Sequence, residues 1–303
     1  MADYWVIDGH CDSLIDYVDG LRTLNNPQEG GHWDLVRGRQ GNLKLQFLAA
    51  FIETKYKPER AIVRGLELIQ GAHKLLKSNQ DSLMLIKEKK DLDLLFSSNK
   101  MGVLLSVEGG EILGNHLFLL DTIYELGVRA LGLTWNQRNA IGDGVGESTQ
   151  GSLTKFGEEV IGKMNDLGMI VDVSHLNEAG FWHVLKISTQ PIIASHSCAY
   201  ALCPHPRNLT DAQLKELAEK GGIVGVNFYP EFLVGKGEAN LEDVITHIKH
   251  IVKIAGINSV ALGSDYDGIE ATPSGLEDVG KFGNLAISLQ EAGFTQEEIE
   301  KIM

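Results

Sequence analysis

"MGVLLSVEGG", residues 101–110, is a nearly uninterrupted apolar run that ends on an acidic residue and two glycines. Continuous apolar runs of this length are typical of parallel strands that are buried on both faces of a sheet. Other runs of the same character lie along the chain, and each of them predicts a strand. The eight expected strands cover residues 5–10, 43–51, 101–110, 128–136, 169–175, 191–197, 222–229 and 259–268.

Segments with helical periodicity lie between these runs. The expected helices cover residues 58–79, 90–99, 115–127, 154–168, 177–188, 210–222, 240–256 and 281–293. Strands that alternate with helices predict an α/β protein in which eight strands close into a (β/α)8 TIM barrel, one domain over residues 1–303. A doubly wound open sheet is the alternative, but no Gly-x-Gly-x-x-Gly motif follows the first strand to support a dinucleotide-binding fold.

The chain is acidic, with 27 Lys and Arg against 41 Asp and Glu residues and a formal net charge of −14. This balance gives no basic surface for nucleic acid or anionic lipid, so we expect neither nucleic acid nor a membrane as a partner. The N-terminal stretch "MADYWVIDGHCD" lacks a secretory signal, and no apolar window is long enough for a membrane helix. The three cysteines do not predict a disulfide framework. We therefore expect a cytoplasmic protein.

Several expected strands end on residues that can bind a metal ion. In a (β/α)8 barrel the carboxyl ends of all strands open on one rim, where the active site lies. Grouping several carboxylates and imidazoles in a nearly closed rim is costly unless a cation holds them, so a metal centre is predicted. The polar residues at these strand ends are His10, Asp12, Glu108, Asp172, His175, His196, Asp265 and Asp267.

The donor types of this group indicate which metal it would bind. Residues i and i+2 of a strand point the same way, so His10 and Asp12 can reach one ion while Cys11 points away. Imidazole and carboxylate ligands without a thiolate suit zinc, with manganese, cobalt or iron as alternatives. Three imidazoles and two carboxylates exceed what one catalytic zinc usually takes from protein. They suit two ions that share a carboxylate and a hydroxide.

The motifs "DGHCD", "SVEGG", "VDVSH", "SHS" followed by "HPRNLTD", and "GSDYDG" resemble, in this order, those of the membrane dipeptidase (renal dipeptidase-like) family of dizinc peptidases. The soluble bacterial branch is the most similar. The resemblance implies a metal-dependent hydrolase barrel with two Zn²⁺ per chain. It implies that His10 and Asp12 bind the first zinc and that His175 and His196 bind the second. It implies that Glu108 bridges the two.

The resemblance also implies roles outside the metal ligands. Asp265, the first Asp of "DYDG", corresponds to the acid/base residue, and Arg207 in "HPRNLTD" to the residue that binds the substrate's C-terminal carboxylate. An ion pair with Asp211 is the alternative for Arg207. Asp172 has two open roles, orienting His175 or capping a strand. Asp267 either supports its neighbour Asp265 or closes a turn.

The fourth strand departs from the mammalian pattern. Mammalian members carry a histidine just after the Thr of this motif, whereas "LTWNQRN" has Trp135 at that position. Asn136 is therefore a candidate for polar contact with substrate, as are Arg138 and Asn139, with loop capping as the competing role. Tyr229, after the seventh strand, is a candidate for the wall of the substrate pocket.

Together these features predict a zinc-dependent dipeptidase that cleaves small dipeptides, including those with a C-terminal D-residue, through a metal-bridging hydroxide. Two alternatives stay open. One is another metal-dependent amidohydrolase, acting on an N-acyl amino acid or a cyclic amide, and the other is a non-catalytic barrel that binds a ligand. Family members are often dimeric and continue past the stretch that corresponds to "EEIEKIM", so a homodimer and a further C-terminal segment are expectations from the resemblance.

Overall fold

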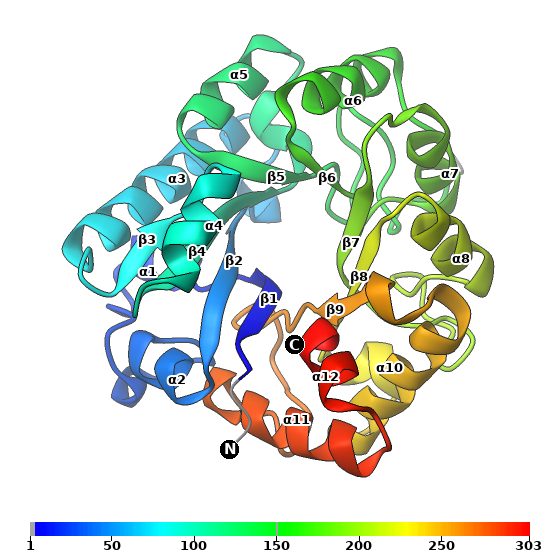
Figure 1. Ribbon diagram of the computed structural model, residues 1–303. Helices are drawn as coiled ribbons and strands as arrows, with labels where there is room; N and C mark the ends of the chain where they lie inside the picture. The colour runs from blue at the N-terminus through cyan, green and yellow to red at the C-terminus, as the bar shows by residue number, and fades with distance from the viewer. Residues whose placement is uncertain (1–3, 150) are drawn as a thin grey trace.

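The strands of the chain form a closed parallel barrel surrounded by helices (Figure 1). The computed structural model describes residues 4–149 and 151–303. The barrel strands are β1 (Val6–Cys11), β2 (Leu43–Phe51), β4 (Met101–Glu108), β5 (Val128–Gly132), β6 (Ile170–Asp172), β7 (Ile192–Ser197), β8 (Ile223–Val226) and β9 (Val260–Leu262). The ring closes because β1 pairs in parallel with both β2 and β9. The predicted (β/α)8 TIM barrel is therefore confirmed, and the open sheet is excluded.

All eight predicted strands are present, and every residue of β4 is buried, as its continuous apolar sequence predicts. One short strand was not predicted: β3 (Leu83–Leu85) lies outside the ring and pairs only with β4. The last predicted strand was too long, since β9 ends at Leu262 and the chain then turns through residues with positive φ, 63° at Asp265 and 64° at Asp267.

The outer helices follow the predicted periodic segments. They are α3 (Ala61–Ser78), α4 (Lys89–Phe96), α5 (Phe118–Glu125), α6 (Lys155–Leu167), α7 (Glu178–Ile187), α8 (Asp211–Glu219), α10 (Leu241–Ala255) and α11 (Phe282–Glu291). Shorter helices that were not predicted are α1 (Leu14–Val18), α2 (Leu35–Gln40), α9 (Pro230–Leu233) and α12 (Gln296–Ile302). Single 3₁₀ turns cover Pro27–Glu29, Thr54–Tyr56, Gly110–Leu113, Ile257–Ser259 and Val279–Lys281.

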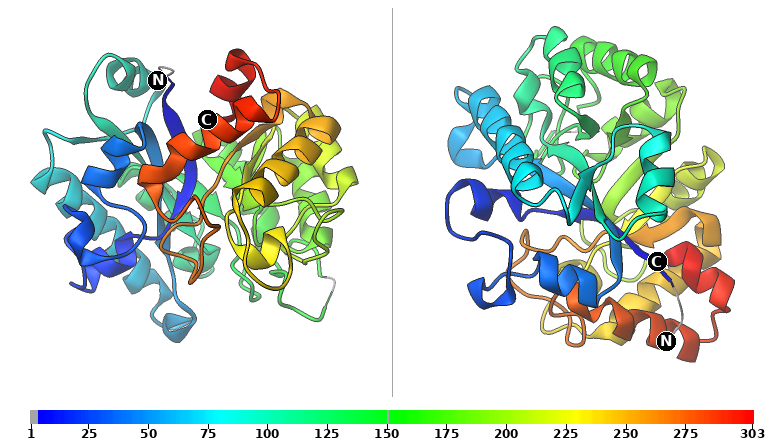
Figure 2. Two further views of the ribbon diagram at one scale, coloured as in Figure 1. Left: turned by 90° about the horizontal axis from the view of Figure 1, so that it is seen from below. Right: turned by 60° about the vertical axis from the view of Figure 1, so that its left-hand side comes forward.

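The two ends of the barrel differ. Both chain termini lie at one end, and the loop that follows β9 lies toward the other (Figure 2). At the terminal end, the backbone N–H of Ile7 in β1 donates to the carbonyl of Met303, which follows α12. The carboxyl ends of the strands face the opposite end, which is the catalytic face of this fold.

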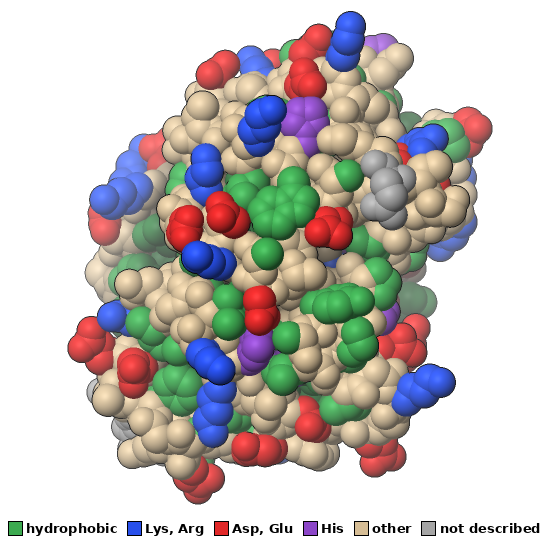
Figure 3. Space-filling view, turned by 90° about the vertical axis from the view of Figure 1, so that its right-hand side faces the viewer, with side chains coloured by type: hydrophobic (Ala, Val, Ile, Leu, Met, Phe, Trp, Pro, Cys, Tyr) green, Lys and Arg blue, Asp and Glu red, His purple; other side chains and the backbone are tan. Residues whose placement is uncertain are grey.

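The outer surface carries both signs of charge. On the face turned toward the viewer in Figure 3, basic side chains are dispersed among acidic ones. In the part of the chain that the structure describes, no helix combines the length and the apolar character that crossing a membrane requires.

Candidate metal centre and substrate pocket

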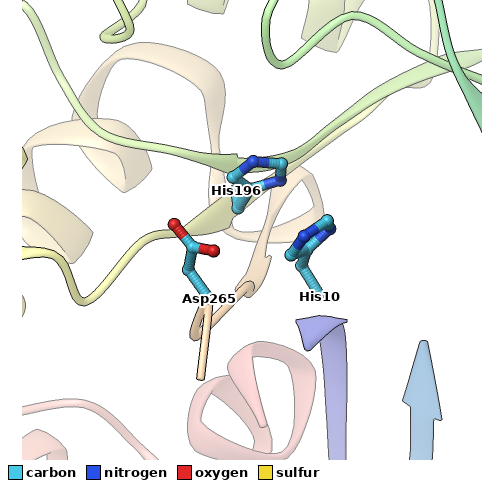
Figure 4. A group of neighbouring side chains, drawn as sticks. All are labelled: His10, His196 and Asp265. Atoms are coloured by element: carbon cyan, nitrogen blue, oxygen red, sulfur yellow. The ribbon is translucent and has the colours of Figure 1, made fainter. Parts of the chain in front are cut away.

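Strand ends bring a group of imidazoles and carboxylates together at the catalytic face. Three overlapping sets of residues could each hold a metal ion. Within each set the donor atoms lie within 4.8 Å of one another, and each set contains residues from different strands. Figure 4 shows the rings of His10 and His196 and the carboxylate of Asp265 converging from three segments of the barrel. The sets are His10, Asp12 and Glu108; Glu108, His175 and His196; and His10, His196 and Asp265.

Glu108 lies between two halves of this group. Its Oε2 is 3.3 Å from the Nε2 of His10, which is itself 3.3 Å from the Oδ2 of Asp12. Its Oε1 is 2.6 Å from the Nε2 of His175 and 3.7 Å from the Nε2 of His196. Each carboxylate oxygen thus faces a different pair of candidate ligands. This arrangement suits a carboxylate shared by two ions.

Hydrogen bonds define the tautomer of His175. Its Nδ1 lies 2.8 Å from the Oδ1 of Asn136, an acceptor, so this nitrogen carries the proton. Its Nε2 receives a hydrogen bond of 3.1 Å from Nη2 of Arg207, and a guanidinium can only donate. The Nε2 of His175 therefore presents a lone pair to the centre of the group.

A second network defines the tautomer of His196. Its Nδ1 lies 2.7 Å from the hydroxyl of Ser195, and that hydroxyl donates to the Oδ2 of Asp172 at 2.5 Å. Because the only hydroxyl proton of Ser195 goes to Asp172, the Nδ1 of His196 must donate to Ser195. The Nε2 of His196 is then unprotonated. Asp172 thus acts on His196 through Ser195. Of its two predicted roles, capping a strand is the one observed, because Asp172 ends β6 and its Oδ1 accepts from the backbone N–H of Ser174 at 3.0 Å. Among the described residues it makes no hydrogen bond to His175.

The two unprotonated nitrogens face each other. The Nε2 atoms of His175 and His196 are 2.9 Å apart, and Glu108 adds its negative charge beside them. Two lone pairs at this distance repel unless a cation lies between them. Near them, within the described residues, the buried Nε2 of His10 and Oδ1 of Asp12 have no hydrogen-bond partner. These residues therefore fit a metal centre, in donor type and in protonation.

The surroundings of His175 and His196 also favour their neutral form. Burial lowers the pKa of His175 to about 4 and holds that of His196 well below its usual value, so both rings are neutral near pH 7. Burial would raise the pKa of Glu108, but His10 holds it well below its usual range. Metal ligands must be deprotonated, and His175, His196 and Glu108 meet that condition. Burial would lower the pKa of His10, but Asp12 and Glu108 raise it well above its usual value, so a metal ion would have to displace its proton.

Cys11 lies away from this group. It is fully buried among the apolar residues of the core, and its Sγ is 3.0 Å from the hydroxyl of Ser13. The alternation of β1 accounts for this, because His10 points to the rim while Cys11 points to the opposite side of the strand. All three cysteines are free.

The loop after β9 holds Asp265 beside the group. The side-chain amide of Asn227 donates to its Oδ2 at 2.9 Å, and burial raises the pKa of Asp265 to about 7. Gly268 makes this approach possible, because a Cβ at that position would lie 2.1 Å from the Oδ2 of Asp12 and 2.5 Å from the Oδ1 of Asp265. A side chain at Gly268 would therefore collide with both carboxylates.

Asp267 anchors the same loop to the segment after β1. Its Oδ1 accepts from the backbone N–H of His32 at 2.5 Å, and its Oδ2 lies 2.9 Å from Nη1 of Arg22 and accepts from the hydroxyl of Ser13. Of its two predicted roles, closing a turn is confirmed, because Asp267 and Gly268 form a turn in which the backbone N–H of Gly268 donates to the carbonyl of Asp265 at 3.0 Å.

A pocket of about 320 Å³ opens over the group. Arg207, a residue that is 3% exposed, lines it, and burial lowers the pKa of its guanidinium to about 10, so it stays charged at neutral pH. Among the described residues its Nε and Nη1 have no hydrogen-bond partner. The alternative partner, Asp211, instead pairs with His250 at 2.7 Å. Arg207 therefore has two donors free for a ligand.

The other predicted substrate residues divide into two kinds. Asn136 and Tyr229 line the pocket, although the Oδ1 of Asn136 is already bonded to His175. Arg138 pairs with Asp143, and Asn139 accepts from the backbone N–H of residue 141 at 2.8 Å, so these two have the loop role. Sequence reasoning missed Ser195, Asn227 and Glu270. Ser195 lies in β7 beside His196, Asn227 follows β8, and Glu270 lies in the loop after β9.

With this geometry in view, the chain can be compared with known proteins. The family model described as membrane dipeptidase (peptidase family M19) matches residues 1–303. The chain belongs to this family. A dipeptidase of Schizosaccharomyces pombe, described as uncharacterized, is 38% identical over an alignment of 306 positions. The alignment covers 95% of this chain and 72% of that protein. The family assignment makes the chain a peptide hydrolase and implies metal ions in its site.

Several solved structures superpose closely on the chain. Dipeptidase AC, a family M19 metallopeptidase, has a TM-score of 0.93 and 27% identity, covering 99% of this chain and 96% of that one. A metallopeptidase of Rhodobacter sphaeroides, with a TM-score of 0.93, 26% identity and the same coverage, is liganded with a phosphinate mimic of the dipeptide L-Ala-D-Ala. A probable dipeptidase of Pseudomonas aeruginosa, PvdM, is 21% identical and shares the fold, with a TM-score of 0.93 over 99% of this chain and 92% of that one.

Proposed function

We propose that the chain is a zinc-dependent dipeptidase that cleaves the peptide bond of free dipeptides, including those with a C-terminal D-residue. Arg207 is the observation that carries the proposal, because a buried guanidinium with two free donors opens into the pocket beside the candidate metal ligands. Because Nη2 of Arg207 is already bonded to His175 and to the carbonyl of His196, Nε and Nη1 are the donors that remain for charge-assisted hydrogen bonds to a substrate carboxylate. Arg207 would hold the carboxylate that every dipeptide has one residue from its only peptide bond.

Two ions are proposed because Glu108 turns one oxygen to each half of the ligand group. His10 and Asp12 would hold one ion, His175 and His196 the other, and Glu108 both. Imidazole and carboxylate donors suit zinc, with manganese, cobalt or iron as substitutes. When bound, the ions would supply the positive charge that generates hydroxide from water near neutral pH and polarises the scissile carbonyl.

The remaining chemistry falls to Asp265. Asn227 occupies its Oδ2, which leaves its Oδ1 to take a proton from the attacking water and pass it to the leaving amine. His175 and His196 are kept neutral and oriented by Asn136 and Ser195, so their lone pairs stay directed at the centre. The dipeptide mimic bound to the Rhodobacter sphaeroides relative supports the inclusion of D-residues at the C-terminal position.

The test is a hydrolysis panel on metal-defined protein. L-Xaa-D-Xaa and L-Xaa-L-Xaa dipeptides would be compared with N-acyl amino acids and cyclic amides, and the metal content would be measured by mass spectrometry. We expect about two ions per chain, hydrolysis of dipeptides, loss of activity on chelation and recovery with zinc. Turnover of N-acyl amino acids or cyclic amides alone would favour the broader amidohydrolase function. A chain that binds no metal would contradict the proposal.

Ser195 offers a test of the ligand network that does not depend on substrate. Replacing Ser195 by alanine removes the hydroxyl that receives the proton of His196 and links it to Asp172. We expect the affinity for metal to fall about 10- to 100-fold, measured by competition with a chromogenic chelator. Ser197→Ala is the matched control, because this buried hydroxyl on the same strand has no partner among the described residues. Equal affinities of the two variants would show that Ser195 does not orient His196.

A further inference from the structure

The pocket contains one carboxylate that the proposed chemistry does not use. Its acidic lining residues are Asp12, Glu108, Asp265, Asp267 and Glu270. The first two belong to the candidate metal ligands, Asp265 is held by Asn227, and Asp267 is paired with Arg22. Glu270 is exposed to water, and among the residues that the structure describes it has no cationic partner. It is therefore a negative charge lining the pocket that no cation of the described residues neutralises.

One wall of the pocket connects Glu270 to Arg207. The guanidinium of Arg207 lies 5.4 Å from the ring of Phe232, and that ring packs edge-on against the ring of Tyr229 at 5.1 Å between centroids. Tyr229 is close enough to Glu270 for this carboxylate to contribute, after burial and Glu231, to the raised pKa of its hydroxyl. The wall thus carries a buried cation at its inner end and an exposed carboxylate at its outer end.

A dipeptide has the opposite arrangement of charges. Near neutral pH its C-terminus is a carboxylate and its N-terminus is largely an ammonium group. With the carboxylate on Arg207, the ammonium needs a negative partner that is not already paired with a metal ion or an arginine. Building on the proposed dipeptidase function, we propose that Glu270 binds the free amino group of the substrate and makes the site selective for dipeptides with an uncapped N-terminus.

This role distinguishes a dipeptidase from an N-acyl amino acid hydrolase with the same metal centre. Both substrate classes present a carboxylate and an amide bond, and they differ in the group that lies beyond the amide. The carboxylate of Glu270 would attract an ammonium group at this position. An acyl chain would offer no such attraction and would displace part of the water that hydrates the carboxylate. Selectivity would thus come from attraction of one class and from exclusion of the other.

The experiment compares L-Ala-D-Ala with N-propanoyl-D-Ala, which lacks only the amino group. For the wild-type protein we expect a clear preference for the free dipeptide. Glu270→Gln should raise KM for L-Ala-D-Ala about 5- to 30-fold with little change in kcat, and should leave the propanoyl compound unaffected. Glu270→Lys should lower the preference further, because it places a like charge beside the ammonium.

Glu231→Gln is the matched control. It removes a neighbouring carboxylate that also affects Tyr229 but does not line the pocket, so the preference should stay the same. If Glu270→Gln and Glu270→Lys both retain the wild-type preference while dipeptides are hydrolysed, the role of Glu270 is overturned and the dipeptidase function stands. If the wild-type protein hydrolyses no dipeptide, both proposals fail together.

Discussion

Replacing Asp265 by asparagine is expected to lower kcat by about two to four orders of magnitude while the protein keeps its metal ions. Asparagine has nearly the same shape, and its side-chain oxygen can still accept the hydrogen bond that Asn227 now donates to the Oδ2 of Asp265. The amide cannot take up a proton from water and return it to the leaving amine. The loss should therefore fall on turnover and not on folding.

The metal content of Asp265→Asn distinguishes an acid/base role of Asp265 from a role as metal ligand. Asp265 also lies within 4.8 Å of ring nitrogens of His10 and His196, so it could act as a ligand. If Asp265→Asn loses ions together with activity, its carboxylate holds metal and the acid/base role is unsupported. If the variant keeps both its ions and wild-type turnover, Asp265 has no part in proton transfer. Saturating substrate and mass spectrometry of the same preparation would separate these outcomes.

Replacing Arg207 by methionine is expected to raise KM for free dipeptides by about 30- to 4,000-fold, because it removes a charged hydrogen-bonding partner from a buried site. Dipeptide amides lack the carboxylate, so their already weak binding should change only slightly. Nη2 of Arg207 also bonds to His175 and to the carbonyl of His196, so the substitution could disturb the candidate metal ligands. Such a disturbance would affect dipeptides and dipeptide amides alike, and the comparison of the two substrates corrects for it.

A lysine at the same position refines this test. Arg207→Lys keeps the positive charge and loses the planar fork, so we expect an intermediate KM for the free dipeptide. Equal increases for dipeptide and amide in both variants would mean that Arg207 supports the ligand histidines and does not bind the substrate carboxylate.

The barrel could be predicted because each of its strands is a run of apolar residues between periodic segments. β4 and β2 are clear cases, buried along most of their length. The extent of β9 could not be predicted, since the chain turns through positive φ at Asp265 and Asp267, and Asp267 is held by Ser13 from the distant segment after β1.

The candidate site could be predicted in part for a similar reason. His10, Glu108 and His196 end different strands, and a closed barrel brings such residues together whatever their separation in sequence. The action of Asp172 on His196 could not be predicted, because it depends on Ser195 lying between Asp172 and His196. Glu270 has no motif of its own, and only the folded pocket reveals it as an unpaired charge.

The pairing of β1 with β9 has a consequence for biosynthesis. Asp8 and Leu262, which are far apart in the sequence, are neighbours in the ring. His10 and Asp265 therefore cannot meet until β9 and the loop after it have left the ribosome. Until then the site lacks Asp265, although all five candidate metal ligands, between residues 10 and 196, have already been synthesised. Such distant contacts also slow folding, which makes the unclosed barrel the state most exposed to aggregation.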